Sequence, residues 1–118
     1  MIEMMLTDDR HSFQPGDTIS GSLRWELEKA AEFITVELYW TTKGKGTKDT
    51  FVAESSQIAT MGQLQGESRF RLTAPAAPYS FSGRLISLIW HVEIAGKDEL
   101  DSAGEEITIA PGGKEIRL

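Results

Sequence analysis

The sequence predicts an all-β protein, an antiparallel sandwich of seven to eight strands. Three observations predict this fold class. Apolar and polar residues alternate with a period of two in most segments, as half-buried strands require. Glycine and proline turn signals separate these segments at short intervals. No stretch has both the periodicity and the length of a stable helix, so the strands must pair with one another.

The turn signals divide the chain into an ordered series of expected strands. In the second strand, Ile19, Leu23 and Trp25 share one face with Gly21, and polar residues occupy the other. The segment from Leu27 to Phe33 has a helix-forming composition but is short, so we interpret it as a connection with room for one helical turn. The expected strands lie at about 2–7, 17–27, 33–42, 50–60, 66–73, 84–95, 104–110 and 114–118.

Three tryptophans, Trp25, Trp40 and Trp90, fall on predicted inner faces. Aromatic residues of this kind can form a stacking platform for a sugar or another ligand, or they can fill a core. Because each tryptophan shares its parity with Ile, Leu and Val neighbours, the pattern favours the core.

The strand expected at 84–95 is apolar on both faces. Ile86, Leu88 and Trp90 belong to the inner face, whereas Leu85 and Ile89 belong to the outer face. Such a strand is usually central or covered. A loop, the N-terminal segment and a partner chain are three alternatives for what covers Leu85 and Ile89.

Composition limits the classes of partner. The 118 residues suit a single domain, 1–118, with a net charge of −6 that disfavours nucleic acid. There is no cysteine, no apolar run long enough to cross a membrane and no visible export signal. We therefore expect a cytoplasmic protein without a transmembrane segment.

No motif carries catalytic or metal chemistry. The sequence contains only two histidines and no nucleophile elbow, and its glycine–lysine run precedes a strand instead of a helix. His91 and Glu93 lie two residues apart on one strand face, but without a neighbouring third ligand we interpret them as a surface pair. We expect no enzyme activity, no cofactor and no metal.

Lys43, Lys45 and Lys48 form the basic cluster of an acidic chain, at an expected hairpin tip. A solvated turn is one interpretation, and a contact for an acidic partner is the other. Together with Leu85 and Ile89, these lysines are the candidate partner contacts.

Several motifs together resemble the N-terminal domain of the arrestin family. Over residues 11–95 their order and spacing are similar to those of the family, whose sporulation-control and retromer relatives share such patterns. The sequence departs from it in having room for one sandwich where family members usually carry two, and in Trp90 where tyrosine is more usual. The matching residues are Phe13, Pro15, Gly16, Asp17, Gly21, Leu23, Phe70, Leu72, Pro75, Pro78, Ser80, Phe81, Gly83, Leu88, Trp90 and Val92.

The resemblance implies an immunoglobulin-like, arrestin-like sandwich with a scaffold or adaptor role. We therefore expect a non-catalytic protein-binding domain, with homo-oligomers through sheet edges as an extension of that role. The alternative is an immunoglobulin-like module that binds a carbohydrate or another small molecule through Tyr39 or Tyr79. The sequence leaves the identity of the partner open.

Overall fold

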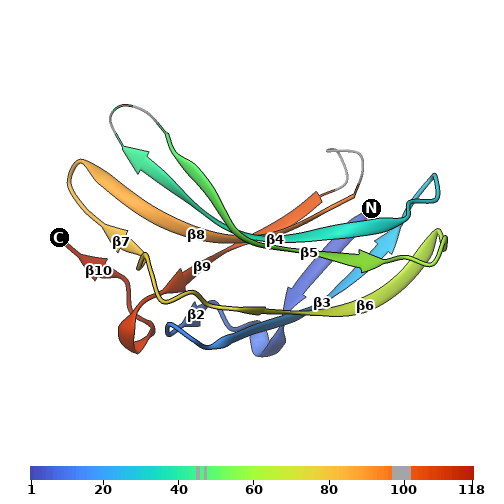
Figure 1. The fold of residues 1–118 in the computed structure, drawn as a ribbon, viewed down its shortest axis with the longest axis horizontal. Helices are drawn as coiled ribbons and strands as arrows, with labels where there is room; N and C mark the ends of the chain where they lie inside the picture. Colours follow the sequence, from blue (N-terminus) through green and yellow to red (C-terminus); the bar gives the residue numbers. More distant parts are fainter. Residues whose placement is uncertain (45, 47, 97–101) are drawn as a thin grey trace.

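Two β-sheets packed face to face form the protein in the computed structural model, which describes residues 1–44, 46, 48–96 and 102–118 (Figure 1). The smaller sheet has the order β1-β3-β6, and all its pairs are antiparallel. The larger sheet has the order β10-β7-β8-β4-β5, with β9 beside β8 and β2 beside β9. The elements are β1 (Ile2–Leu6), η1 (Thr7–Asp9), β2 (Ser12–Phe13), β3 (Thr18–Glu26), β4 (Phe33–Gly44), β5 (Thr50–Ala59), β6 (Gln65–Thr73), β7 (Phe81–Ser82), β8 (Ile86–Ala95), β9 (Ser102–Ile109), η2 (Pro111–Gly113) and β10 (Ile116–Arg117).

The predicted all-β sandwich is confirmed, and each expected segment contains a strand. Two strands were not predicted, β2 and β7, which have two residues each and pair in parallel with β9 and β10. The connection between β3 and β4 contains bends and no helical turn. Short strands that depend on distant partners leave no periodic signal in the sequence.

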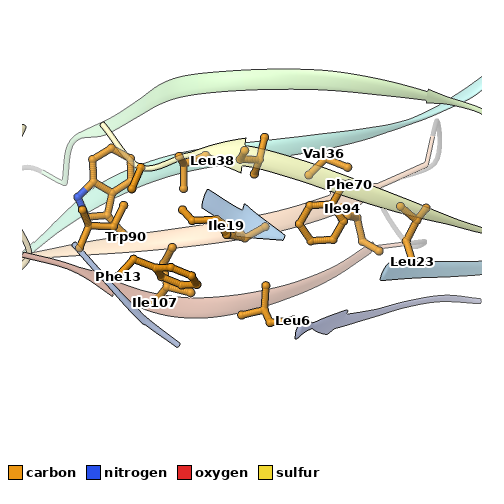
Figure 2. Packing of buried hydrophobic residues seen from close by; sticks show 14 of the residues in the cluster. Leu6, Phe13, Ile19, Leu23, Val36, Leu38, Phe70, Trp90, Ile94 and Ile107 are labelled. Carbon is orange, nitrogen blue, oxygen red and sulfur yellow. The ribbon is translucent and has the colours of Figure 1, made fainter. Parts of the chain in front are cut away.

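The core lies between the two sheets and draws on both (Figure 2). Ile19 and Leu23 of β3 and Phe70 of β6 face Val36 and Leu38 of β4 across the sandwich. This interdigitation of inward side chains is what the period-two pattern predicts.

The tryptophans belong to the core to different degrees. Trp25 and Trp90 are buried, and the Nε1–H of each donates to a backbone carbonyl, at 3.0 Å to Gln63 and 2.9 Å to Pro78 respectively. Trp40 is partly buried and stacks on the exposed ring of Phe51. The core interpretation is therefore correct for Trp25 and Trp90, and Trp40 lies at the margin of the core.

Glycine is required at one position of β3, between its partners β1 and β6. A Cβ atom at Gly21 would come within 2.6 Å of both the Met5 carbonyl oxygen and the Phe70 ring. Gly21 therefore allows Phe70 to fill the space beside the central strand of the smaller sheet.

β8 is central, as predicted from its apolar character on both faces, with β4 on one edge and β7 and β9 on the other. The expectation that Ile86 faces the core is wrong, because this residue is 43% exposed at the start of the strand. At this end of β8 the strand pairs with the last residue of β4, Gly44.

A histidine ties the segment before β2 to the larger sheet. His11 Nδ1 hydrogen-bonds with the Asp9 carbonyl at 2.9 Å, and its Nε2 lies 3.2 Å from Glu105 Oε2 of β9. The Asp9 backbone bond, opposed by burial and aided by the Glu105 carboxylate, raises the pKa of His11 above its ordinary value. His11 therefore favours the folded state when it is protonated.

We expect replacement of His11 by glutamine to cost stability in acid and not in base. Because the pKa of His11 is higher in the folded state, its contribution to stability is complete below the unfolded-state pKa of about 6.5. The contribution is lost as the pH rises through the folded-state pKa. For a half-exposed pair the contribution is a few tenths to about 1 kcal/mol. Urea unfolding of both proteins across this pH range measures the difference. Subtracting the free energy of unfolding of the variant from that of wild type also cancels the contribution of His91. The pKa of His91 is lowered, so its effect on stability changes with pH in the opposite direction. A difference that grows with pH would contradict the assignment.

Candidate functional site: the outer face of the larger sheet

The candidate site is the outer face of the larger sheet, which we define as the side turned away from β1, β3 and β6. Alternation places Tyr39, Thr41 and Lys43 of β4 on this face, where cross-strand pairing brings them beside His91, Ile89 and Ser87 of β8. Figure 1 shows that β4 and β8 curve along their length, with the last part of β4 and the first part of β8 rising away from β3 and β6. The outer face is therefore concave along the strands.

Four of the five predicted contact residues lie near one end of the larger sheet. Lys43 lies at the end of β4, diagonal to Ile89, and the carbonyl of Leu85 lies so close to Gly44 that a Cβ there would come within 2.1 Å. Lys48 lies in the connection between β4 and β5 and lines the same groove as Thr41. Lys45 falls outside the described residues.

Leu85 is 70% exposed, and Ile89 is half-buried on the outer face. Neither a loop nor the N-terminal segment of the described chain covers Leu85. A partner chain that covers Leu85 stays a prediction.

A network of hydrogen bonds and ring contacts occupies the middle of the outer face. The rings of Tyr39 and His91 stack with centroids 4.9 Å apart and planes 15° from parallel. The Tyr39 hydroxyl donates to Glu93 Oε2 at 2.9 Å, and His91 Nε2 hydrogen-bonds with Thr41 Oγ1 at 3.0 Å. His91 and Glu93 are therefore each bonded to β4 and not to one another, which refines their interpretation as a surface pair.

The network keeps its two titratable rings neutral near pH 7. Burial is the main cause that lowers the pKa of His91, with Lys48 adding to the effect and Glu106 and Glu93 opposing it. Burial, followed by the bond to Glu93, raises the pKa of Tyr39 to about 12. The rings of Tyr39 and His91 are thus uncharged, between the lysine end and the carboxylate end.

Carboxylates occupy the other end of the outer face. Glu37 of β4 lies directly opposite Glu93 of β8, and Glu106 of β9 lies opposite His91. Like charges placed opposite one another disfavour the pairing of strands. A groove of about 380 Å³ runs over this region and is lined by Glu37, Tyr39, Thr41, Lys48, Thr50, Val52, His91 and Glu93.

The groove includes Tyr39 but not Tyr79, the second tyrosine predicted as a ligand contact. Tyr79 lies in the crossover before β7 and is partly exposed. Sequence reasoning did not identify Val52 or Thr50 as part of the face, because only the pairing of β5 with β4 brings them there.

Within the described ranges no cluster of His, Asp or Glu is placed to hold a metal ion. No helix among the same residues has the length and apolar character needed to cross a bilayer.

The two sheets form an all-β sandwich of arrestin-like fold. No known family profile matches the sequence, and no curated protein matches it. Among solved structures the fold is similar to that of Spo0M, a sporulation control protein from Bacillus subtilis, with a TM-score of 0.63 and 14% sequence identity. The match covers 92% of this chain and 48% of that protein, so the chain spans about half of the neighbour's length.

Proposed function

We propose that the chain is a non-catalytic, cytoplasmic protein-binding domain of the scaffold or adaptor type. Its partner docks on the outer face of the larger sheet, at the end where Lys43, Lys48, Leu85 and Ile89 lie together. The observations that carry this proposal are a leucine that is 70% exposed, with its backbone next to the end of β4, and two lysines at the same end of the larger sheet. An apolar anchor flanked by charge is a common arrangement at protein interfaces. The arrestin-like fold and the regulatory name of its structural neighbour support the same class of function.

We expect a combined Leu85→Ser and Lys43→Glu variant to lose its partner. Removing an anchor and reversing a neighbouring charge weakens binding about tenfold or more. The measurement is quantitative capture of proteins from the native source by immobilised wild-type and variant domains.

The matched control is Met61→Ser, which removes another exposed apolar side chain in the turn between β5 and β6. Proteins that bind wild type and Met61→Ser but not the combined variant support the proposal. If the combined variant captures the same proteins in the same amounts, the docking face is elsewhere.

The groove around Tyr39 favours a second candidate, a module for a carbohydrate or another small polar ligand. Its stacked rings and carboxylates are suited to such a ligand. However, the Tyr39 hydroxyl already donates to Glu93, so a ligand would have to replace an existing bond. A thermal-shift screen of glycans on wild type and a Tyr39→Phe, Tyr79→Phe variant separates this candidate from the first.

Homo-oligomers through sheet edges are the extension of the first proposal. β5 pairs only with β4 among the described strands, which leaves its other edge for a second chain. The register shift between Leu38 and Tyr39 interrupts the pairing of β4 with β5, so the longer uninterrupted part of β5 runs from Glu54 to Ala59. Light scattering that finds monomers at high concentration would remove this extension.

A further inference from the structure

A second surface lies on the opposite side of the sandwich, on the outside of the smaller sheet. Near the middle of the central strand β3, the residues that point outward are the small Ser20 and Ser22. Longer side chains stand on both sides, with Met5 on β1 and Arg69 and Arg71 on β6. The result is a trough of about 500 Å³ along β3, which we call the arginine trough.

The two arginines of the trough have no carboxylate opposite them. Arg69 lies opposite Ser22 and Arg71 opposite Ser20, whereas Arg24 on the same face lies between Glu3 and Glu67. Within the described part of the chain, neither Arg69 nor Arg71 forms an ion pair. In a chain with a net charge of −6, two neighbouring arginines without acidic partners are available to an external anion.

The walls of the trough restrict how an anion approaches. The Ser20 hydroxyl donates to Thr7 Oγ1 at 3.1 Å and fixes the end of β1 against β3. Asp8, which has a positive φ of 58°, lines the trough at this end, on the wall opposite the arginines. Met5 is 70% exposed in the same wall. An incoming chain would therefore meet cations along β6 and an apolar side chain along β1, with one repelling carboxylate at the end.

The spacing of the arginines matches an extended acidic peptide. Arg69 and Arg71 are two residues apart on one strand, so their side chains leave the sheet roughly 7 Å apart. Carboxylates at every second position of an extended peptide have the same spacing. Both arginines are exposed, so one small anion would gain little from either in water. A peptide with several carboxylates contacts both guanidinium groups at once, so it gains binding free energy from both.

We propose that the arginine trough binds an acidic polypeptide segment in an extended conformation, with alternate carboxylates on Arg69 and Arg71. The segment lies along β3, its apolar side chains next to Met5. This surface is separate from the docking face proposed above, and a protein with both could hold two partners on opposite sides of the sandwich. Nucleic acid, another polyanion, is an outcome that the test below separates from the peptide.

The test uses a fluorescent peptide with glutamate at every second position and threonine between, measured by fluorescence anisotropy. We expect binding that weakens as salt is added, and a loss of about tenfold or more in an Arg69→Gln, Arg71→Gln variant. Asp8→Asn removes the opposing carboxylate, so it should tighten binding about two- to threefold. Far-ultraviolet circular dichroism verifies that each variant is folded.

The matched control is Arg24→Gln, an arginine on the same face that already has acidic neighbours. We expect it to leave peptide binding within about twofold of wild type. Equal losses in Arg24→Gln and the double variant would overturn the proposal, because the effect would then follow total charge. Wild type that binds inorganic phosphate or oligothymidylate as tightly as the peptide would overturn it too, as would no binding of the peptide.

Discussion

We expect Trp90→Ala to lower the free energy of unfolding by about 3–5 kcal/mol, the range for removing a large aromatic side chain from a core. Trp90 is 0% exposed and lies opposite Trp40 across the central strand pair β8–β4. Since a domain of this size has about 5–15 kcal/mol in total, the variant would be close to unfolding at room temperature. The measurement is urea unfolding, with the midpoint compared at constant slope.

Trp40→Ala is the matched control, because Trp40 has the same side chain in the next strand but lies at the edge of the core. Its loss should be clearly smaller. Trp90→Phe keeps a large aromatic ring but loses the bond to the Pro78 carbonyl and part of the buried volume, so we expect an intermediate cost. Equal losses in Trp90→Ala and Trp40→Ala would show that the core does not depend on Trp90. This comparison also tests the idea of a ligand platform, which predicts lost binding with little lost stability.

The strands and the inner faces could be predicted because they are local properties of the chain. Ile19, Leu23 and Trp25 alternate with polar residues, and the structure buries all three. β2 and β7 could not be predicted in the same way. Each has two residues, and each exists because a distant segment supplies a parallel partner.

The candidate surfaces were predictable to a smaller extent. Alternation alone places Leu85 and Ile89 on the outer side of β8, but their proximity to Lys43 depends on the register between β4 and β8. The same is true of Arg69 and Arg71, whose outward direction follows from Phe70 and its neighbours. The serines that make the trough come from β3, which lies more than forty residues earlier in the chain. Pairing between strands is non-local, so a single sequence contains little information about it.

We expect the second large loss of stability from Ser80→Ala, in the crossover before β7. Ser80 is buried, and its Oγ accepts a hydrogen bond from the Ile109 N–H at 2.9 Å. Its backbone N–H donates to the Ile109 carbonyl at 2.7 Å, and its carbonyl accepts from Ile116 at 3.1 Å. One residue thus joins the crossover to β9 and to β10.

Alanine removes the acceptor and leaves the buried Ile109 N–H without a partner, a cost of about 1–3 kcal/mol. The backbone bonds of Ser80 remain, so the loss should be local to the junction between the crossover and β9. Hydrogen exchange measured by NMR should show faster exchange at the Ile109 amide, with a lower urea midpoint for the whole domain.

Ser82→Ala provides the matched control two residues further on. Ser82 is only half-buried, and its carbonyl accepts a backbone hydrogen bond from the Leu118 N–H at 3.0 Å. We expect that variant to unfold within about 0.5 kcal/mol of wild type, as surface substitutions usually do. If both serine variants lose the same stability, the hydroxyl of Ser80 contributes nothing specific. In that case the backbone bonds alone hold the crossover against β9.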